Sequence, residues 1–195
     1  MKFVELSDAE FKKFEQKNKL GNFFQSVERS KLRTNMGWKR YLLGVKDDDK
    51  VLAASFMMMR DGNALVQLGP IMDFANTKLL NFWIKNVVKF AKEKQAICLE
   101  VFPPYLIAER DTKGVILNDW SGSEIVKSFV DAGFEYEGKT IELENKANRW
   151  MAVKNLADFE DIAGVRASYK KNVRNKLRKI SPELEIYEMK DRSEL

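Results

Sequence analysis

Histidine is absent from this sequence of 195 residues, and cysteine occurs once, as Cys98. The lack of histidine excludes Ser-His-Asp and Cys-His catalysis and removes the commonest transition-metal ligand, so we expect no metal site. A single cysteine also excludes a disulfide within the chain. Because Cys98 lies between Ile97 and Leu99 in an apolar run, we predict a buried structural thiol rather than a nucleophile.

Long apolar runs are lacking as well. The most apolar stretch, Val51 to Met59, is far shorter than the roughly 20 residues that cross a bilayer, so we predict no transmembrane segment. Near the N-terminus, Glu5 interrupts the apolar residues that a secretory signal would need, and no small-residue cleavage site follows. These features predict a cytoplasmic protein.

The chain nevertheless has the composition of a globular protein. Hydrophobic residues make up 45% of it and aromatic residues 11%, which is enough apolar surface for a sizeable core. The 34 basic residues outnumber the 29 acidic ones and give a net charge of +5. This is a mild preference for anionic partners, and its meaning depends on how the charges are distributed.

The spacing of the apolar residues predicts alternating strands and helices. Ser7 and Glu10 form a capping box at the start of one helix, and Asn76 caps a long one. Acidic turns divide the stretch from Lys39 to Leu68 into three antiparallel strands. This order is typical of an α/β fold with a mixed sheet flanked by helices, as in acetyltransferase-like (acyl N-acyltransferase) domains. The predicted elements are a strand at 3–6, helices from 8 and 26, the three strands, a helix from 76, a strand at 96–101 and a helix at 123–132.

The last part of the chain differs in character, because a polar stretch precedes a strongly basic region. We therefore predict a first acyltransferase-like domain at 1–147 and the beginning of a second such domain, cut short, at 148–195. The elements predicted there are strands at 134–141 and 149–153, a helix from Phe159 and a strand at 184–187.

Three segments carry the most specific motifs. Residues 24–26 (Phe-Gln-Ser) open a helix that ends at residues 37–38 (Gly-Trp), and residues 68–73 (Leu-Gly-Pro-Ile-Met-Asp) form a turn before the long helix. Residues 149–153 lead into the basic residues 168–174. In order and approximate spacing these segments resemble the Fem family of aminoacyl-tRNA-dependent peptidyl transferases, over essentially the whole chain.

The resemblance implies a reaction of peptidoglycan interpeptide-bridge synthesis. An amino acid passes from aminoacyl-tRNA, as co-substrate and without a further cofactor, to the stem-peptide amine of a UDP-linked or lipid-linked muramyl pentapeptide. The amine has a free pKa of roughly 10.4, so the enzyme must deprotonate it and hold it close to the ester. Family members continue for another domain, so the resemblance is to their N-terminal half.

Family position also implies candidate site residues. A basic residue on the second helix contacts the acceptor diphosphate in the family, and Arg33 matches it, with Lys31 two residues away. A solvated helix face is the simpler interpretation of the same residues. Where relatives often place an acceptor-binding aspartate, this chain has Phe102. Glu100, on the same side of that strand, and Asp73, which also suits a turn, are candidate carboxylates, and the catalytic base stays unassigned.

The basic region predicts a surface for phosphates. No acidic residue occurs between Ile162 and Pro182, and apolar residues recur there every three or four positions, as in a helix that buries one stripe and exposes its charges. A tRNA backbone or a lipid-linked precursor at the inner membrane surface would fit equally well. The apolar stripe is Val165, Tyr169, Val173, Leu177 and Ile180, and the candidate cations are Lys170, Lys171, Arg174 and Arg178.

Two other functions stay open. An acetyl-CoA-dependent N-acetyltransferase would share the fold, but it cradles pyrophosphate on backbone N–H groups before a helix. Here Pro70 has no N–H to donate, and Asp73 would repel phosphate. A non-catalytic nucleic-acid-binding module could be built on the basic helix, although no RNA-binding signature accompanies it and most aromatic residues have core-like spacing.

Overall fold

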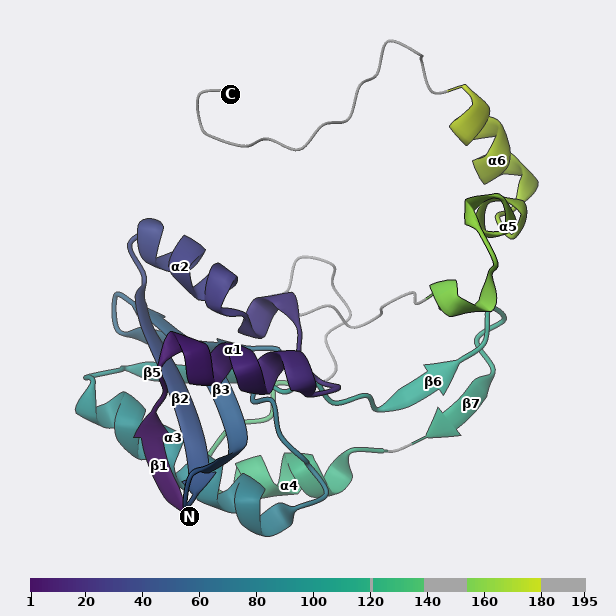
Figure 1. Cartoon of the computed structure of the whole chain (residues 1–195). Coiled ribbons are helices and arrows are strands. Elements are labelled where there is room, and N and C mark those ends of the chain that lie inside the picture. Colours follow the sequence, from purple (N-terminus) through teal and green to yellow (C-terminus); the bar gives the residue numbers. More distant parts are fainter. Residues whose placement is uncertain (120, 139–153, 180–195) are drawn as a thin grey trace. The chain divides into compact units, whose positions relative to one another are not determined.

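The computed structural model describes residues 1–119, 121–138 and 154–179 of the chain. The chain divides into two compact units, Met1–Arg149 and Trp150–Leu195 (Figure 1). Each unit is described by itself. The interpretation of the second unit as the start of a second acyltransferase-like domain stays a prediction.

A five-stranded mixed sheet forms the centre of the first unit. Its strands follow one another in chain order, and all neighbours are antiparallel except β4 and β5, which are parallel. Asp48 and Asp61 take positive φ angles of 48° and 52° at the two tight turns, as acidic turn residues tolerate. The predicted antiparallel strands are thereby confirmed. The strands are β1 (Lys2–Glu5), β2 (Lys39–Asp47), β3 (Lys50–Arg60), β4 (Asn63–Gln67) and β5 (Cys98–Phe102).

The helices begin where the sequence predicts. The side chains of Ser7, Ser26 and Asn76 each accept a hydrogen bond from a backbone N–H in the first turn, and the capping box of Ser7 and Glu10 is complete. The helix after Ser26 ends before Gly37, whose φ is +84°. The helices are α1 (Asp8–Lys17), α2 (Val27–Asn35), α3 (Thr77–Glu93) and α4 (Ser123–Asp131), with a 3-10 turn η1 (Phe23–Gln25) before α2.

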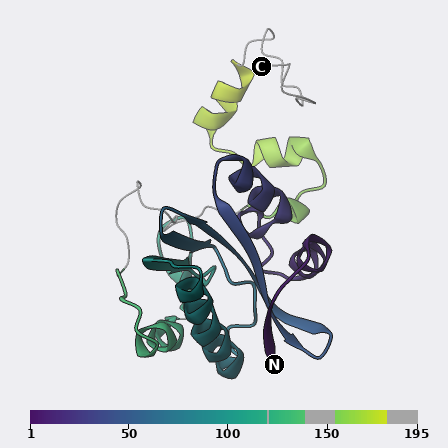
Figure 2. The same ribbon diagram turned by 90° about the vertical axis from the view of Figure 1, so that its left-hand side faces the viewer.

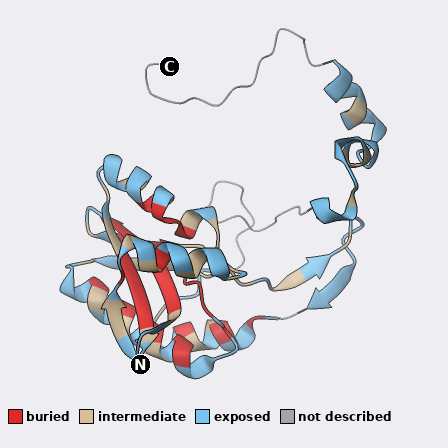
Figure 3. Ribbon diagram, viewed as in Figure 1, coloured by how far each residue is buried: buried red, intermediate tan, exposed pale blue. Residues whose placement is uncertain are grey.

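The helices cover both faces of the sheet. Figure 2 shows α1 and α2 on one side and α3 and α4 on the other. Because side chains alternate along a strand, Phe56 of β3 packs with Phe11 of α1, whereas its neighbour Met57 packs with Trp83 of α3. Burial is concentrated in β2 and β3 between the two helix layers (Figure 3). The predicted mixed α/β fold is confirmed.

The last strand differs from the prediction. We predicted a buried strand at 96–101 with Cys98 as a buried thiol, but the strand is shifted to Cys98–Phe102 and Cys98 is exposed. Within the part of the chain that the structure describes, this strand pairs only with β4. Its apolar side chains Leu99 and Val101 are half-buried against the α3 layer. The apolar run thus reflects one covered face of an edge strand, and the prediction for Cys98 was wrong.

A small hairpin was missed by the sequence analysis. Strands β6 (Ala108–Arg110) and β7 (Ile116–Asp119) pair across a turn in which the Asp111 carboxylate accepts from the N–H groups of Lys113 and Val115. Strands this short carry little periodicity. Residues 134–138 are not in a strand, contrary to prediction, and the remaining strand predictions, 139–141, 149–153 and 184–187, lie outside the described residues.

The second unit contains two short helices where one was predicted. After η2 (Leu156–Asp158), α5 (Ile162–Ala167) is capped by Asp161, and α6 (Lys171–Arg178) follows a break at which Lys170 is extended. The predicted burial of one stripe is wrong for Tyr169, Val173 and Leu177, which are each at least a third exposed, whereas Val165 is half-buried. Ile180 lies outside the described residues. No helix in the described parts of the chain is long and apolar enough to span a bilayer.

Candidate anion-binding site

Two of the sequence motifs meet at a buried glutamine. The side-chain amide of Gln25 donates to the carbonyl of Gln67 on β4 at 2.8 Å, and its oxygen accepts from the N–H of Phe56 on β3 at 2.7 Å. Gly69 packs against this amide so closely that a Cβ there would lie 2.5 Å from the Gln25 amide carbon. The glutamine and the glycine therefore join η1 to the sheet and position α2, which begins two residues after Gln25.

The Gly-Pro turn uses its own N–H groups internally. Gly69 donates to the carbonyl of Phe102 at 3.1 Å, and Ile71 donates to Ala54 at 2.8 Å, beyond the cis peptide that joins Gly69 to proline. The Asp73 carboxylate accepts from the N–H of Ala75 at 3.0 Å. With these donors engaged, the turn does not offer the row of N–H groups on which a cofactor pyrophosphate is held.

Arg33 lies on α2 against an aromatic ring. Its guanidinium carbon is 5.8 Å from the ring centroid of Trp38, and Arg60 at the end of β3 approaches the same ring at 4.6 Å. The Nε atom of Arg33 is enclosed without a hydrogen-bond partner. Arg60 also makes a loose ion pair with Asp61 at 3.7 Å. Two guanidinium groups from distant parts of the chain thus converge on Trp38.

Arg29 lies one turn earlier on the same face of α2. Its guanidinium carbon is 5.5 Å from the ring centroid of Phe23 and 5.3 Å from that of Phe24. Partial burial, followed by the nearby charge of Arg33, lowers the pKa of Arg29 below its usual value. The group stays cationic at neutral pH, because the pKa of an arginine lies far above neutrality.

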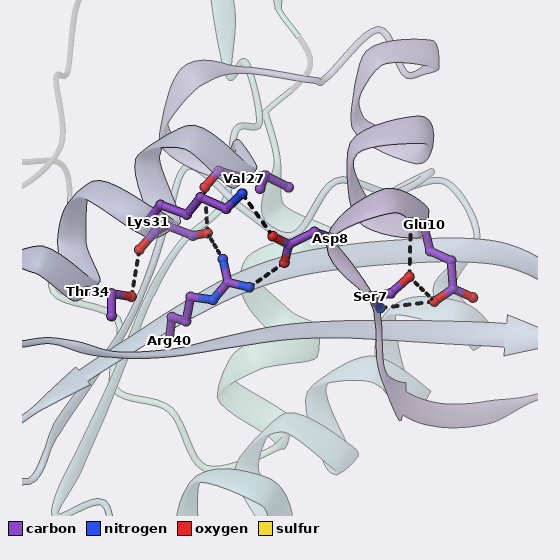
Figure 4. Close-up of polar contacts among 8 residues, drawn as sticks. Ser7, Asp8, Glu10, Val27, Lys31, Thr34 and Arg40 are labelled. Atoms are coloured by element: carbon purple, nitrogen blue, oxygen red, sulfur yellow. Dashed lines mark hydrogen bonds and ion pairs between the residues drawn. The ribbon is translucent and has the colours of Figure 1, made fainter. Parts of the chain in front are cut away.

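Lys31, the second predicted diphosphate contact, points elsewhere. Residues two positions apart do not share a helix face, and Figure 4 shows the Lys31 ammonium group at the Asp8 carboxylate of α1, 3.2 Å away. The same carboxylate accepts from Arg40, which also donates to the Ser30 hydroxyl at 2.9 Å. The structure therefore does not bring Lys31 and Arg33 together, and Lys31 helps to join α2 to α1.

We call the resulting site the arginine-aromatic surface. The sequence analysis found Arg33 and missed the other two arginines. Spacing of four residues on a helix could have indicated Arg29, whereas Arg60 reaches the site only through the pairing of β2 with β3. The surface consists of Arg29, Arg33 and Arg60 with Phe23, Phe24 and Trp38.

The candidate carboxylates lie on different segments, Glu100 on β5 and Asp73 in the turn before α3. Leu99 and Val101 face α3, so Glu100 faces the side of α1 and α2, half-buried beside its β4 partner Leu65. Asp73 is exposed at the turn before α3 and holds that turn through Ala75.

A comparison with models of protein families shows to which family this chain belongs. The model of the FemAB family matches residues 6–183 of the chain. This protein belongs to the FemAB family. Aminoacyltransferase FemB of Staphylococcus epidermidis (strain ATCC 12228 / FDA PCI 1200) is 32% identical over 163 residues, which are 80% of this chain and 39% of FemB. The resemblance inferred from the motifs is thereby confirmed.

Two further relatives agree with this membership. Aminoacyltransferase FemA of Staphylococcus aureus (strain bovine RF122 / ET3-1) is 25% identical over 148 residues, or 71% of this chain and 34% of FemA. A crystal structure of FemX superposes with a TM-score of 0.64 at 16% identity, covering 91% of this chain and 43% of FemX. At that identity the superposition supports the fold alone. The chain spans 39% of the length of FemB.

The second unit of this FemAB-family chain gathers cations around a cavity. Arg166, Arg174 and Arg178 line a cavity of about 310 Å³ between α5 and α6, together with Ala167 and Leu177. The Nε atom of Arg174 is enclosed without a partner. Of the predicted cations, Lys171, Arg174 and Arg178 recur at three- and four-residue spacing and lie along one side of α6, whereas Lys170 is the residue that precedes the helix.

Proposed function

We propose that this FemAB-family protein takes part in transferring an amino acid from aminoacyl-tRNA to the stem-peptide amine of a peptidoglycan precursor, in the cytoplasm. The observation that supports the proposal is the arginine-aromatic surface, which includes Arg33, the residue for which the resemblance implies a diphosphate contact. Its relatives FemB and FemA are named as aminoacyltransferases. The internally bonded Gly-Pro turn argues against the acetyl-CoA alternative.

The proposed reaction needs neither a metal nor a bound cofactor. The acceptor amine attacks the ester carbonyl of aminoacyl-tRNA, a C–N bond forms, and the ester C–O bond to the ribose breaks. The proton lost by the amine ends on the ribose oxygen. Glu100 and Asp73 are the candidate proton carriers, and of the two Glu100 lies on the same side of the sheet as α2, which carries Arg33. Holding the amine beside the ester supplies much of the rate.

The acceptor and the donor would use different units of the chain. A UDP-linked or lipid-linked muramyl pentapeptide would place its diphosphate on the arginine-aromatic surface of the first unit. The basic face of α6 suits tRNA phosphates, or a peripheral contact with an anionic membrane when the acceptor is lipid-linked. Neither role requires a side chain to titrate, so binding should weaken with added salt rather than with a change of pH near neutrality.

Calorimetric titration with UDP-linked muramyl pentapeptide tests this proposal, with CoA as the competing ligand. We expect saturable binding of the precursor that Arg33→Gln weakens about tenfold, as loss of one charge-assisted phosphate contact should. Lys85→Gln, which removes an exposed cation from α3 on the opposite face of the sheet, is the matched control. Saturable binding of CoA without binding of the precursor would contradict the proposal.

A further inference from the structure

Arg29 and Arg33 are the charged residues of α2 that form no ion pair with a described residue. Arg29 and Arg33 are one turn apart, and within the described residues no carboxylate lies within 4.0 Å of either guanidinium group. The acidic residue of this helix, Glu28, forms an ion pair with Lys12 of α1. The other cation of the helix, Lys31, forms an ion pair with Asp8. Two like charges therefore share one face of α2 without a counter-ion among the described residues.

Both guanidinium groups are held in place by rings. Arg29 lies over Phe23 and Phe24, and Arg33 lies over Trp38. A ring beneath a guanidinium group restricts its rotamers and leaves the N–H groups in its plane able to bind an anion. In Arg33 these are the terminal N–H groups, because its Nε atom is enclosed. The side chain of Phe23 is 57% exposed, so the edge of this support is open to solvent. The pair is organised before any ligand arrives, which reduces the entropy that binding must overcome.

The number of donors indicates which class of anion the pair would bind. One guanidinium fork binds one phosphate group bidentately. Residues four apart on a helix have Cβ atoms roughly 5–6 Å apart, so their long side chains can reach two neighbouring groups of one ligand. A diphosphate presents two adjacent anionic groups, whereas a monophosphate or a carboxylate presents one. The arrangement of Arg29 and Arg33 fits a diphosphate ester.

We infer that Arg29 is a second phosphate-binding residue of the acceptor site, and that its pairing with Arg33 selects a diphosphate over a monophosphate. The inference rests on the proposed function for the identity of the acceptor. Arg29 would contact one phosphate and Arg33 the other. The diphosphate is esterified to uridine in one precursor form and to a polyprenyl chain in the other, and the arginine pair would bind both forms.

An NMR titration of the whole chain with inorganic pyrophosphate and inorganic phosphate tests the pair without the precursor. The Nε–H signal of Arg29 and the terminal guanidinium N–H signals of both arginines report contact with the anion. We expect the wild type to bind pyrophosphate at least about tenfold more tightly than phosphate, and Arg29→Gln to remove most of that preference. Arg29→Lys keeps the charge but loses the fork, so it should restore only part of the preference. Lys85→Gln controls for the loss of one charge.

The same variants are then titrated with UDP-linked muramyl pentapeptide, the lipid-linked form in micelles, and the muramyl pentapeptide 1-phosphate. Arg29→Gln should weaken whichever diphosphate forms bind by about tenfold and leave the monophosphate unchanged. A pyrophosphate preference that survives Arg29→Gln would overturn the inference, whatever the precursor does. An Arg29-dependent preference in a protein that binds neither precursor form would keep the inference and contradict the proposed acceptor.

Discussion

Gln25 illustrates how a polar side chain can be buried without leaving an unsatisfied group. Its amide joins two strands, accepting from the N–H of Phe56 and donating to the carbonyl of Gln67. Gly69 lies against the same amide because any side chain there would overlap it. Two motif positions that are 44 residues apart (69 − 25) therefore form one structural unit. They hold η1 and α2 on the sheet.

Replacing Gln25 by alanine should lower the free energy of unfolding by about 2–4 kcal/mol, because the buried Phe56 N–H loses its acceptor and a cavity opens. Gly69→Ala should also destabilise, since its Cβ overlaps the glutamine. In the double variant the truncated side chain leaves room for that Cβ, so the combined loss should be smaller than the sum by at least about 1 kcal/mol. Urea denaturation measures the free energy of unfolding of the two single variants and the double variant, with exposed Gln16→Ala as the control. Additive losses would refute the contact.

At the scale of elements, α1 is fixed to the sheet through its first turn. The Glu10 carboxylate closes the capping box with Ser7 and also pairs with Lys46 of β2. The Lys46 ammonium group, followed by the backbone N–H and hydroxyl of Ser7, lowers the pKa of Glu10 to about 2. One carboxylate thus stabilises the start of the helix and its attachment to a neighbouring strand.

The lowered pKa of Glu10 makes the free energy of unfolding depend on pH, and the direction of the shift sets the sign. The pKa of Glu10 is lower in the folded protein, about 2, than the roughly 4.3 of an unfolded chain. The contribution of Glu10 to the free energy of unfolding is therefore complete above about pH 5 and is lost as the pH falls toward 2. Urea midpoints of the wild type and Glu10→Gln should differ at pH 7 and converge toward pH 3. Glu15→Gln is the opposite control, because burial raises the pKa of Glu15 and its charge is unfavourable at neutral pH. A constant difference across the range would contradict the assignment.

At the scale of the whole molecule, the core belongs to the first unit. Among the described residues, every buried side chain lies between Leu6 and Phe129. The described helices of the second unit contribute no buried residue. The first unit should therefore fold without the second, whereas the second unit by itself offers little apolar burial to offset the entropy of ordering.

A chain ending at Arg149 should keep the fold of the first unit. The indole N–H of Trp83 donates to the buried Ser55 hydroxyl at 3.1 Å, so its NMR signal reports the packing of α3 on the sheet. That signal should be unchanged in residues 1–149, and the urea midpoint should correspond to a loss of less than ~0.5 kcal/mol. Collapse of the signal, or a loss of several kcal/mol, would place part of the stability in the second unit.

The sequence predicted the elements whose signals are local. The caps at Ser7, Ser26 and Asn76 and the turns at Asp48 and Asp61 were sufficient to define the helices and the meander, because hydrogen bonds within a few residues decide them. The short hairpin and the break between α5 and α6 were missed, because segments of a few residues carry too little periodicity. The burial of the basic stripe was predicted from amphipathicity alone, which says nothing about what covers the apolar side.

By itself, the sequence determined the fold class, the family and the candidate cation Arg33. Only the tertiary structure decided which charges are available. It paired Lys31 with Asp8, left Arg29 beside Arg33, and brought Arg60 to Trp38 across the β2–β3 pair. The physical reason is that periodicity within a segment fixes which face of a helix a side chain occupies, whereas its partners come from other segments and depend on how the helices pack on the sheet.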